Sequence, residues 1–264
     1  MKVTIRLRYH TRFGQKLFLC AQHEWFGGGR QEHALPLRYV DDEFWELALN
    51  LPDTRIPRAP ICYYFRLHNP DGSVTEDFGG DRKLYPAGLA RRHTVIIDSW
   101  NDVGAVENIF FTEPFRNVLL RTERQSGGAK PPVGATHWFN VKAPLLPNGK
   151  TICLLGSSRI LGGWNPAAPV LLQRSAENGC FSVGLDFAGE PLPATYKYGV
   201  FDLDTNAFVR YEDGANRVLA QAAPVPGQVI LNDGFARLTA PPWRGAGVAL
   251  PVFSLRSERS FGVG

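Results

Sequence analysis

Short segments in which apolar and polar residues alternate recur along the chain. Residues 3–9 alternate Val, Ile, Leu and Tyr with Thr and Arg, and residues 45–51 and 63–67 alternate in a similar way. A period of two residues is typical of a half-buried β-strand. Residues 41–49 could also form a short helix, since Glu, Leu and Ala favour helices. The pattern therefore predicts a strand-rich chain with one ambiguous segment.

An internal repeat resolves the ambiguity. Three motifs recur at one spacing: Gly14–Ala21 as Gly149–Gly156, Phe26-Gly-Gly as Leu161-Gly-Gly, and Asp77–Leu84 as Glu212–Leu219. The spacing is 135 residues each time, the difference between positions 149 and 14 or between Arg217 and Arg82. Architectures built from repeats are recognised by such a constant period. On this alignment the strand at Trp45 matches Phe181–Phe187, a poor helix sequence, so a strand is predicted in both places.

The repeat divides the chain into two domains of about 100 residues, a size typical of a two-sheet sandwich. We therefore predict an all-β chain of two tandem antiparallel β-sandwiches of immunoglobulin-like type. Residues 1–113 form the first domain, residues 114–134 a linker and residues 135–238 the second domain. Residues 239–264 are predicted to hold a further linker and the first strand of a truncated barrel domain, because their apolar run resembles a strand buried on both faces.

Composition and charge exclude several classes of protein. Of the 264 residues, 44% are hydrophobic and 20% are charged, which suits a folded core rather than a disordered chain. A net charge of +4 without a basic cluster disfavours a nucleic-acid partner. No apolar stretch approaches the roughly 18 residues of a membrane span, and the N-terminus lacks the apolar core of a signal peptide.

The cysteines bear on the cellular compartment. Cys20, Cys62, Cys153 and Cys180 lie far apart, with no Cys-x-x-Cys pair. Reduced thiols in a cytoplasmic protein are the simplest interpretation, and disulfides in an exported chain are the alternative.

Residues that could carry catalysis show no characteristic spacing. The six histidines form neither His-x-x-x-His nor His-Glu-x-x-His, and the acidic residues are scattered, mostly beside turns. Metal ligands must converge on one face of an element. The sequence thus predicts no metal, no cofactor and no catalytic group within this chain.

Two aromatic residues next to predicted turns are candidates for binding. Trp164 follows Leu161-Gly-Gly, and Tyr211 precedes a glycine-containing turn. Both could be ordinary core residues of a small sandwich. Alternatively, both lie on loops, where sandwiches commonly carry function, and a flat exposed ring suits the apolar C–H face of a sugar.

An ordered set of motifs then runs through the second repeat: Leu161-Gly-Gly-Trp164, Tyr196-Lys197-Tyr198, and Tyr211-Glu212 with Asn216-Arg217. This set resembles the starch-binding domain, carbohydrate-binding module family 20. The resemblance implies a β-sandwich that binds α-1,4-glucan, with Trp164 and Tyr211 stacking on the sugar. It assigns polar contacts with the sugar to Lys197, Glu212 and Asn216. Tyr211 departs from the tryptophan more usual in that family, and Asn148 stands where an aromatic of a second site would fall.

The first repeat resembles a degenerate copy of the same domain. Gly29, Tyr64 and Glu76 occupy the positions of Trp164, Lys197 and Tyr211, so the first type of site is expected to be lost there. Phe13 matches an aromatic of the family's second site, and Tyr39 falls near the place of its partner. The resemblance thus implies a weaker, second-type site at Phe13 and Tyr39.

The C-terminal segment, residues 243–264, resembles the opening of glycoside hydrolase family 77, the 4-alpha-glucanotransferases or amylomaltases. That family implies a transferase that moves an α-1,4-glucan onto the 4-hydroxyl of another sugar, through two carboxylates about 5 Å apart. Its (β/α)₈ barrel needs about 250 residues, so the catalytic residues are expected outside this chain.

Two other classes of function stay open beside the glucan hypothesis. An immunoglobulin-like interaction module without a sugar site would bury Trp164 and leave Lys197 solvated. A self-contained hydrolase is disfavoured because no acid pair is visible. Under the glucan hypothesis the partners are starch, glycogen, maltooligosaccharides and cyclodextrin.

Overall fold

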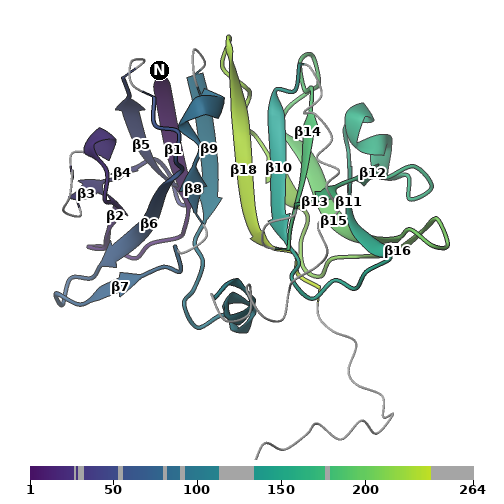
Figure 1. Cartoon of the computed structure of the whole chain (residues 1–264), viewed down its shortest axis with the longest axis horizontal. Helices are drawn as coiled ribbons and strands as arrows, with labels where there is room; N and C mark the ends of the chain where they lie inside the picture. Colours follow the sequence, from purple (N-terminus) through teal and green to yellow (C-terminus); the bar gives the residue numbers. More distant parts are fainter. Residues whose placement is uncertain are drawn as a thin grey trace, which may run out of the picture.

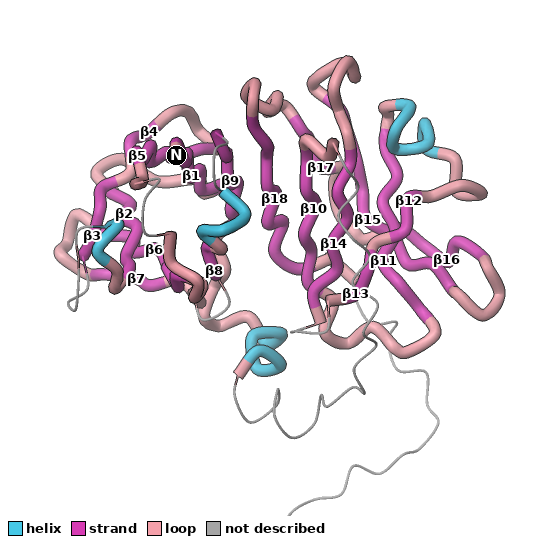
Figure 2. The backbone as a smooth tube through the Cα atoms, turned by 45° about the horizontal axis from the view of Figure 1, so that its top comes forward, coloured by secondary structure: helices cyan, strands magenta, loops and turns pink. Residues whose placement is uncertain are grey.

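The computed structural model describes residues 1–26, 28, 33–52, 56–79, 82–89, 93–112, 134–175 and 179–238. The predicted linker 114–134, apart from Gly134, and the predicted barrel segment 239–264 lie outside these residues. Within them the chain is nearly all β-structure, and the helices are short 3₁₀ turns in connections between strands (Figure 2). No helix in the described ranges is long and apolar enough to cross a membrane.

The strands of the two halves follow one another in a similar order. The first half contains β1 (Lys2–Arg8), β2 (Lys16–Ala21), η1 (Glu24–Phe26), β3 (His33–Pro36), β4 (Arg38–Tyr39), β5 (Phe44–Asn50), β6 (Ile61–His68), β7 (Val74–Glu76), β8 (Lys83–Leu84), η2 (Pro86–Leu89), β9 (His93–Ser99) and η3 (Val106–Phe111). The second half contains β10 (His137–Lys142), β11 (Lys150–Gly156), η5 (Arg159–Trp164), β12 (Val170–Leu171), β13 (Gln173–Arg174), β14 (Cys180–Leu185), β15 (Ala194–Asp202), β16 (Ala207–Tyr211), β17 (Arg217–Leu219) and β18 (Gly227–Phe235).

The alternating segments form strands, as predicted. In β1 the apolar residues Val3, Ile5 and Leu7 are fully buried, and in β6 the buried and more exposed positions alternate throughout. The ambiguous segment is strand β5, which pairs antiparallel with β1, so the helix alternative is wrong. Pairing with β1 decides the conformation because it places Trp45 opposite Leu7 and buries it in the core.

The strands form two outer sheets and one sheet that runs through both halves. The outer sheets have the order β3-β2-β6-β7, with β8 on β6, and β12-β11-β15-β16, with β17 on β15. The third sheet has eight strands, in the order β13-β14-β10-β18-β9-β1-β5-β4 (Figure 1). Most strand pairs are antiparallel, but β1–β9, β10–β18 and β9–β18 are parallel.

The parallel pair β9–β18, here called the seam, joins the halves. It runs in register from His93 opposite Gly227 to Asp98 opposite Asn232. Successive residues of a strand point to opposite faces. In β9, Ile96 enters the core of the first half, whereas Val95 and Ile97 enter the core of the second. The two cores therefore lie on opposite faces of one continuous sheet, which a chain of two domains joined only by a linker would not show.

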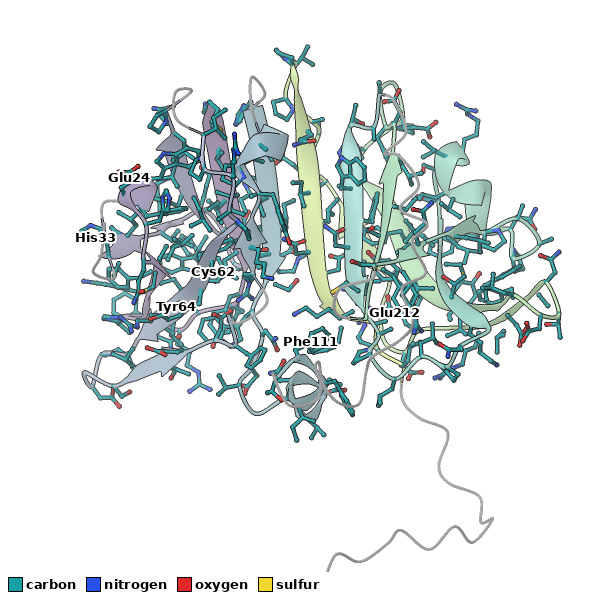
Figure 3. All side chains as sticks on the ribbon, viewed as in Figure 1. Glu24, His33, Cys62, Tyr64, Phe111 and Glu212 are labelled. Carbon is teal, nitrogen blue, oxygen red and sulfur yellow. The ribbon has the colours of Figure 1, made fainter. Side chains whose placement is uncertain are left out.

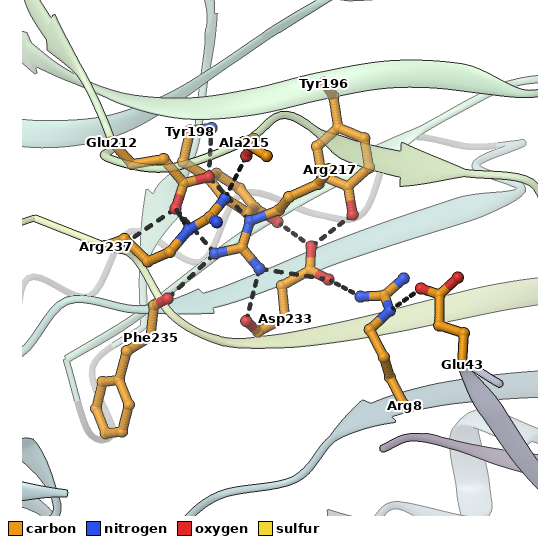
Figure 4. Close-up of polar contacts among 10 residues, drawn as sticks. All are labelled: Arg8, Glu43, Tyr196, Tyr198, Glu212, Ala215, Arg217, Asp233, Phe235 and Arg237. Carbon is orange, nitrogen blue, oxygen red and sulfur yellow. Dashed lines mark hydrogen bonds and ion pairs between the residues drawn. The ribbon is translucent and has the colours of Figure 1, made fainter. Parts of the chain in front are cut away.

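Polar side chains reinforce the seam. The Asn232 amide donates to Asp98 Oδ1 over 2.7 Å, and Gln228 donates to Thr94 Oγ1 over 3.2 Å. Arg8 of the first half lies 3.4 Å from the buried carboxylate of Asp233 in the second (Figure 4). These bonds satisfy groups that would otherwise be buried without partners.

A buried cluster appears once in each half and supports the internal repeat. In the first half it contains Tyr63, Phe65, Asp77, Arg82 and Asp98, and in the second half Tyr196, Tyr198, Glu212, Arg217 and Asp233. The tyrosine hydroxyl donates to the seam aspartate over 2.8 Å in both halves. The arginine lies 5.1 Å above the ring of Phe65 in one half and of Tyr198 in the other. The spacing found in the sequence thus corresponds to the same three-dimensional arrangement.

Candidate functional site

The Leu-Gly-Gly-Trp motif forms a strained turn after β11. Gly162, Gly163 and Trp164 have φ angles of 76°, 55° and 62°, all in the left-handed region. Glycine adopts this region freely, but a residue with a Cβ pays roughly 1–2 kcal/mol to do so. Strain of this kind at a residue with a large side chain points to a function. The turn brings the Trp164 indole onto the outer face of the sheet that contains β11 and β15.

Trp164 and Tyr211 come together, as the sequence resemblance implied. Their ring centroids lie 6.3 Å apart and their planes are inclined at 65°. Both side chains are half-buried and rest on Cys153 and Leu155, which are fully buried. Neither aromatic belongs to the main core of the second half. We call this pair the aromatic platform.

Lys197 and Asn216 lie close to one turn beside the platform. Lys197 belongs to β15, opposite Leu155 of β11, and its Nζ donates to the carbonyl oxygen of Gly214 over 2.6 Å. Asn216 is exposed and lies two residues further along the same turn. The two polar groups are therefore near the edge of the platform, where they can reach a ligand that rests on the rings.

Glu212 is placed differently from the sequence expectation, which gave it a direct contact with sugar. Its carboxylate is buried and accepts hydrogen bonds from Arg217, from the backbone N–H of Tyr198 and from that of Arg237 (Figure 4). Burial raises the pKa of Glu212, but the bonds and charge of Arg217 outweigh it, so the net pKa is lowered. Figure 3 shows Glu212 within the second half. Its carboxylate anchors the turn that carries Gly214 and Asn216.

The first half carries an ion pair in place of the platform. Cys20 of β2 pairs with Tyr64 just as Leu155 pairs with Lys197, so Tyr64 occupies the position of the lysine, as predicted. Glu76 replaces Tyr211 and accepts from Arg66 over 2.7 Å. Gly29, at the position of Trp164, lies outside the described residues. The described residues there offer no second aromatic platform at these positions.

The two aromatics expected at a second-type site differ in exposure. Phe13 is fully exposed, at 104% of its reference area, on the loop between β1 and β2. Tyr39 is about half exposed, packs edge-to-face on Trp45 and donates to Asp42 over 2.7 Å. His10, three residues before Phe13, bonds to the carbonyl of Asp42. The loop and Tyr39 therefore lie at the same end of the first half, but the rings of Phe13 and Tyr39 are not in contact.

Sequence reasoning missed the residues that support the platform. Phe208 of β16 packs on Tyr211 with ring centroids 4.7 Å apart, and Cys153 and Leu155 form the layer beneath. A signal was present, because residues 152–155 are a continuous apolar run, which is typical of a strand covered on both faces. Burial also raises the pKa of the Cys153 thiol to about 12.

Other chemistry is not indicated by the described part of the chain. There, no group of three or more His, Cys, Asp or Glu side chains is arranged to hold a metal ion. The buried acids of the two clusters are each bonded to arginine or tyrosine. The platform and its polar edge are therefore the strongest candidate site.

Comparison with known proteins agrees with this location. Residues 137–228 match the CBM_20 family model, described as a starch binding domain. The chain is 26% identical over 281 residues to "4-alpha-glucanotransferase DPE2" of Oryza sativa subsp. japonica. That alignment covers 99% of this chain but 28% of the relative, so the chain spans less than a third of the relative's length.

Solved structures resemble the chain only weakly. The family 20 carbohydrate-binding module of the maltotetraose-forming amylase from Pseudomonas saccharophila STB07 is 18% identical, with a TM-score of 0.30, over 38% of this chain and 98% of the other. The family 26 module CBMbc of Amy13K from Eubacterium rectale, solved with maltoheptaose, is 11% identical, with a TM-score of 0.25, over 83% of this chain and 87% of the other.

Proposed function

We propose that the second half of this chain, residues 137–235, binds the α-1,4-glucan of starch and related chains at the aromatic platform. The observation that carries the proposal is the pair Trp164 and Tyr211, held 6.3 Å apart on an outer face, with Trp164 in a strained backbone conformation. The match of residues 137–228 to a starch binding domain supports it.

The chemistry of the platform suits a curved sugar chain. The apolar C–H face of a glucose ring loses water when it stacks on an indole or phenol ring, and this burial is favourable. Two rings inclined at 65° follow a bent chain better than a flat one. Lys197 and Asn216, near the edge, supply a donor and an amide for the hydroxyl groups that stacking leaves in water.

We further propose that the chain is the front part of a cytoplasmic 4-alpha-glucanotransferase of the amylomaltase type. The alignment with the rice relative supports this, as does the resemblance of residues 243–264 to the family 77 opening. The transfer reaction would belong to carboxylates outside this chain. A module that tethers a long glucan raises its concentration near a linked catalytic domain.

The first half is proposed to be a second module of the same origin, with a weaker site at Phe13 and Tyr39. The repeated buried cluster and the shared strand order support a common origin. Starch, glycogen, maltooligosaccharides and cyclodextrin are the proposed ligands. A single platform of this kind should bind with about 4–7 kcal/mol, or a Kd from millimolar to tens of micromolar.

Titration of the whole chain with β-cyclodextrin and with maltoheptaose, followed by tryptophan fluorescence and calorimetry, tests the proposal. We expect Trp164→Ala and Tyr211→Ala each to weaken binding about tenfold or more, as the loss of an anchor ring does. Val209→Ala, an exposed change on the same strand as Tyr211, is the matched control and should bind normally. Cellohexaose, whose chain is flat, should bind at least tenfold more weakly.

Normal β-cyclodextrin binding by both platform variants would refute the proposal. The immunoglobulin-like interaction module without a sugar site would then be the better interpretation. No binding of any α-glucan by the unmodified chain would have the same meaning.

A further inference from the structure

The hairpin that carries Tyr211 contains a β-bulge. Along β15 and β16 the pairs are Gly199–Tyr211 and Val200–Arg210, and the next pair is Phe201–Phe208. Val209 is therefore left over between two paired positions. A bulge shifts the alternation of side chains by one residue and can re-aim a ring. Without it, Val209 would share a face with Tyr211, whereas Phe208 would point to the other face.

The bulge brings Phe208 under the platform. Phe208 lies with Tyr211, Trp164 and the buried Cys153 in one apolar cluster on the outer face of the sheet. The Phe208 and Tyr211 ring centroids are 4.7 Å apart, closer than the 6.3 Å between Tyr211 and Trp164. Tyr211 is thus held between two aromatic neighbours, one beside it and one that completes the ligand face.

Gly199 provides the space for this packing. A Cβ at position 199 would lie 2.6 Å from Cε2 of Phe208 and 3.2 Å from Sγ of Cys153. Real Cβ atoms do not come that close to a ring carbon, so any larger residue would displace Phe208. The glycine is the cross-strand partner of Tyr211, and it therefore controls the side chains directly beside that ring.

The first half shows the same cross-strand position without these features. Arg66 and Glu76 are paired there, and the register of β6 and β7 continues without a shift to His68 opposite Val74. The chain from Gly199 to Tyr211 is also two residues longer than that from Arg66 to Glu76, as the numbering shows. The longer hairpin accommodates the bulge, so the aromatic support belongs to the second half only.

From these observations we propose that Phe208 and Gly199 are positioning residues of the platform. Phe208 holds the Tyr211 ring in the tilt that faces a glucan chain, and Gly199 keeps open the space that Phe208 occupies. Neither residue has to touch the sugar. The inference rests on the proposed glucan site and adds what sets its shape.

Variants of the whole chain test this inference. We expect Phe208→Ala to weaken β-cyclodextrin binding about 2- to 10-fold, the range that corresponds to the loss of one aromatic pair. Phe208→Tyr, which keeps the ring, should restore binding, and Phe208→Leu, which keeps only apolar volume, should restore it in part. Gly199→Ala should weaken binding to a similar extent as Phe208→Ala.

A matched control separates positioning from general stability. Phe18→Ala removes a half-buried ring from the outer face of the first half, where it packs on His68 with centroids 4.4 Å apart. It should lower the urea midpoint about as much as Phe208→Ala but leave β-cyclodextrin binding unchanged. If Phe208→Ala does not fold, the comparison of Phe208→Leu with Phe208→Tyr decides the question in its place.

The outcomes also distinguish this inference from the proposed function. If Tyr211→Ala abolishes binding but both Phe208→Ala and Gly199→Ala bind normally, Phe208 and Gly199 do not position the ring. If Phe208→Tyr fails to restore what Phe208→Ala loses, the inference is also wrong. If Trp164→Ala and Tyr211→Ala bind normally, the glucan site itself is refuted, and the inference with it.

Discussion

Val95 of the first half lies directly opposite Val229 of the second half in the parallel pair β9–β18, and both point into the core of the second half. Their neighbours Ile96 and Ile230, one residue along, point the other way into the core of the first half. Each core therefore contains side chains from the other half. The seam is part of both hydrophobic cores rather than a surface contact between two finished domains.

We expect the described chain to unfold as one cooperative unit for this reason. Leu7→Ala, which lies in the first core, should destabilise the chain by about 2–5 kcal/mol. It should lower the hydrogen-exchange protection of β15 in the second half as well as that of β6 in the first, because both exchange through the same global opening. Two separate thermal transitions, or unchanged protection in β15, would contradict the prediction.

Replacement of Trp164 should separate binding from backbone strain. Trp164→Ala and Trp164→Gly both remove the indole, so both should lose about 1–3 kcal/mol of glucan binding. Only glycine relieves the left-handed conformation at φ 62°, so Trp164→Gly should be about 1 kcal/mol more stable than Trp164→Ala. Urea unfolding of the two variants measures the difference. Equal stabilities would show that the strain is absent in solution.

Glu212→Gln should act first on stability. The change leaves the buried Arg217 guanidinium without its counter-charge, and breaking a buried ion pair costs about 3–5 kcal/mol. Asp77→Asn makes the equivalent change opposite Arg82 in the first half and is the matched control. Both should lower the urea midpoint, but only Glu212→Gln should also weaken binding of β-cyclodextrin, because Glu212 anchors the turn of Asn216. A fully stable Glu212→Gln variant that has lost binding would instead indicate direct contact with sugar.

Stability should fall as the pH is lowered from 7 to 5. Burial lowers the pKa of His137, against the smaller opposing effects of its bond to the Gln221 carbonyl and of Asp186. The unfolded chain therefore takes up a proton near pH 6.5 that the folded chain does not, and the contribution is lost as the pH drops through that value. Burial and Lys2 lower the pKa of His93 in the same direction. Thermal midpoints at constant ionic strength should depend less on pH in His137→Gln, and an unchanged slope would exclude His137 as a cause.

Phe13→Ala should leave stability unchanged, because the ring is fully exposed and contributes no buried area. If the proposed second-type site exists, the variant should bind long glucans more weakly, through lost avidity, but should bind β-cyclodextrin at the platform normally. Sedimentation with insoluble starch, compared with β-cyclodextrin titration, measures the two effects. Equal starch binding by Phe13→Ala and the unmodified chain would remove Phe13 from the site.

Much of this architecture was accessible from the sequence because it depends on local patterns. The period of two predicted the strands, the constant spacing of 135 residues predicted the two similar halves, and the positions of Trp164 and Tyr211 beside glycine turns indicated the platform. Each of these signals lies within one strand, one turn or one alignment of the chain with itself. The physical reason is that burial of one face and the conformations open to glycine are written residue by residue.

Only the tertiary structure decided which strands meet and which way Glu212 faces. The apolar runs around Ile96 and Ile230 show that both faces of these strands are buried, but an unpaired strand edge carries no mark of the partner that will cover it. Glu212 next to Tyr211 looks like a sugar ligand in sequence, yet the bulge and the arginine beneath it turn the carboxylate inward and leave the ring outside. Pairing between distant edges and the direction of a buried charge depend on what the rest of the fold brings near, and no local pattern contains that information.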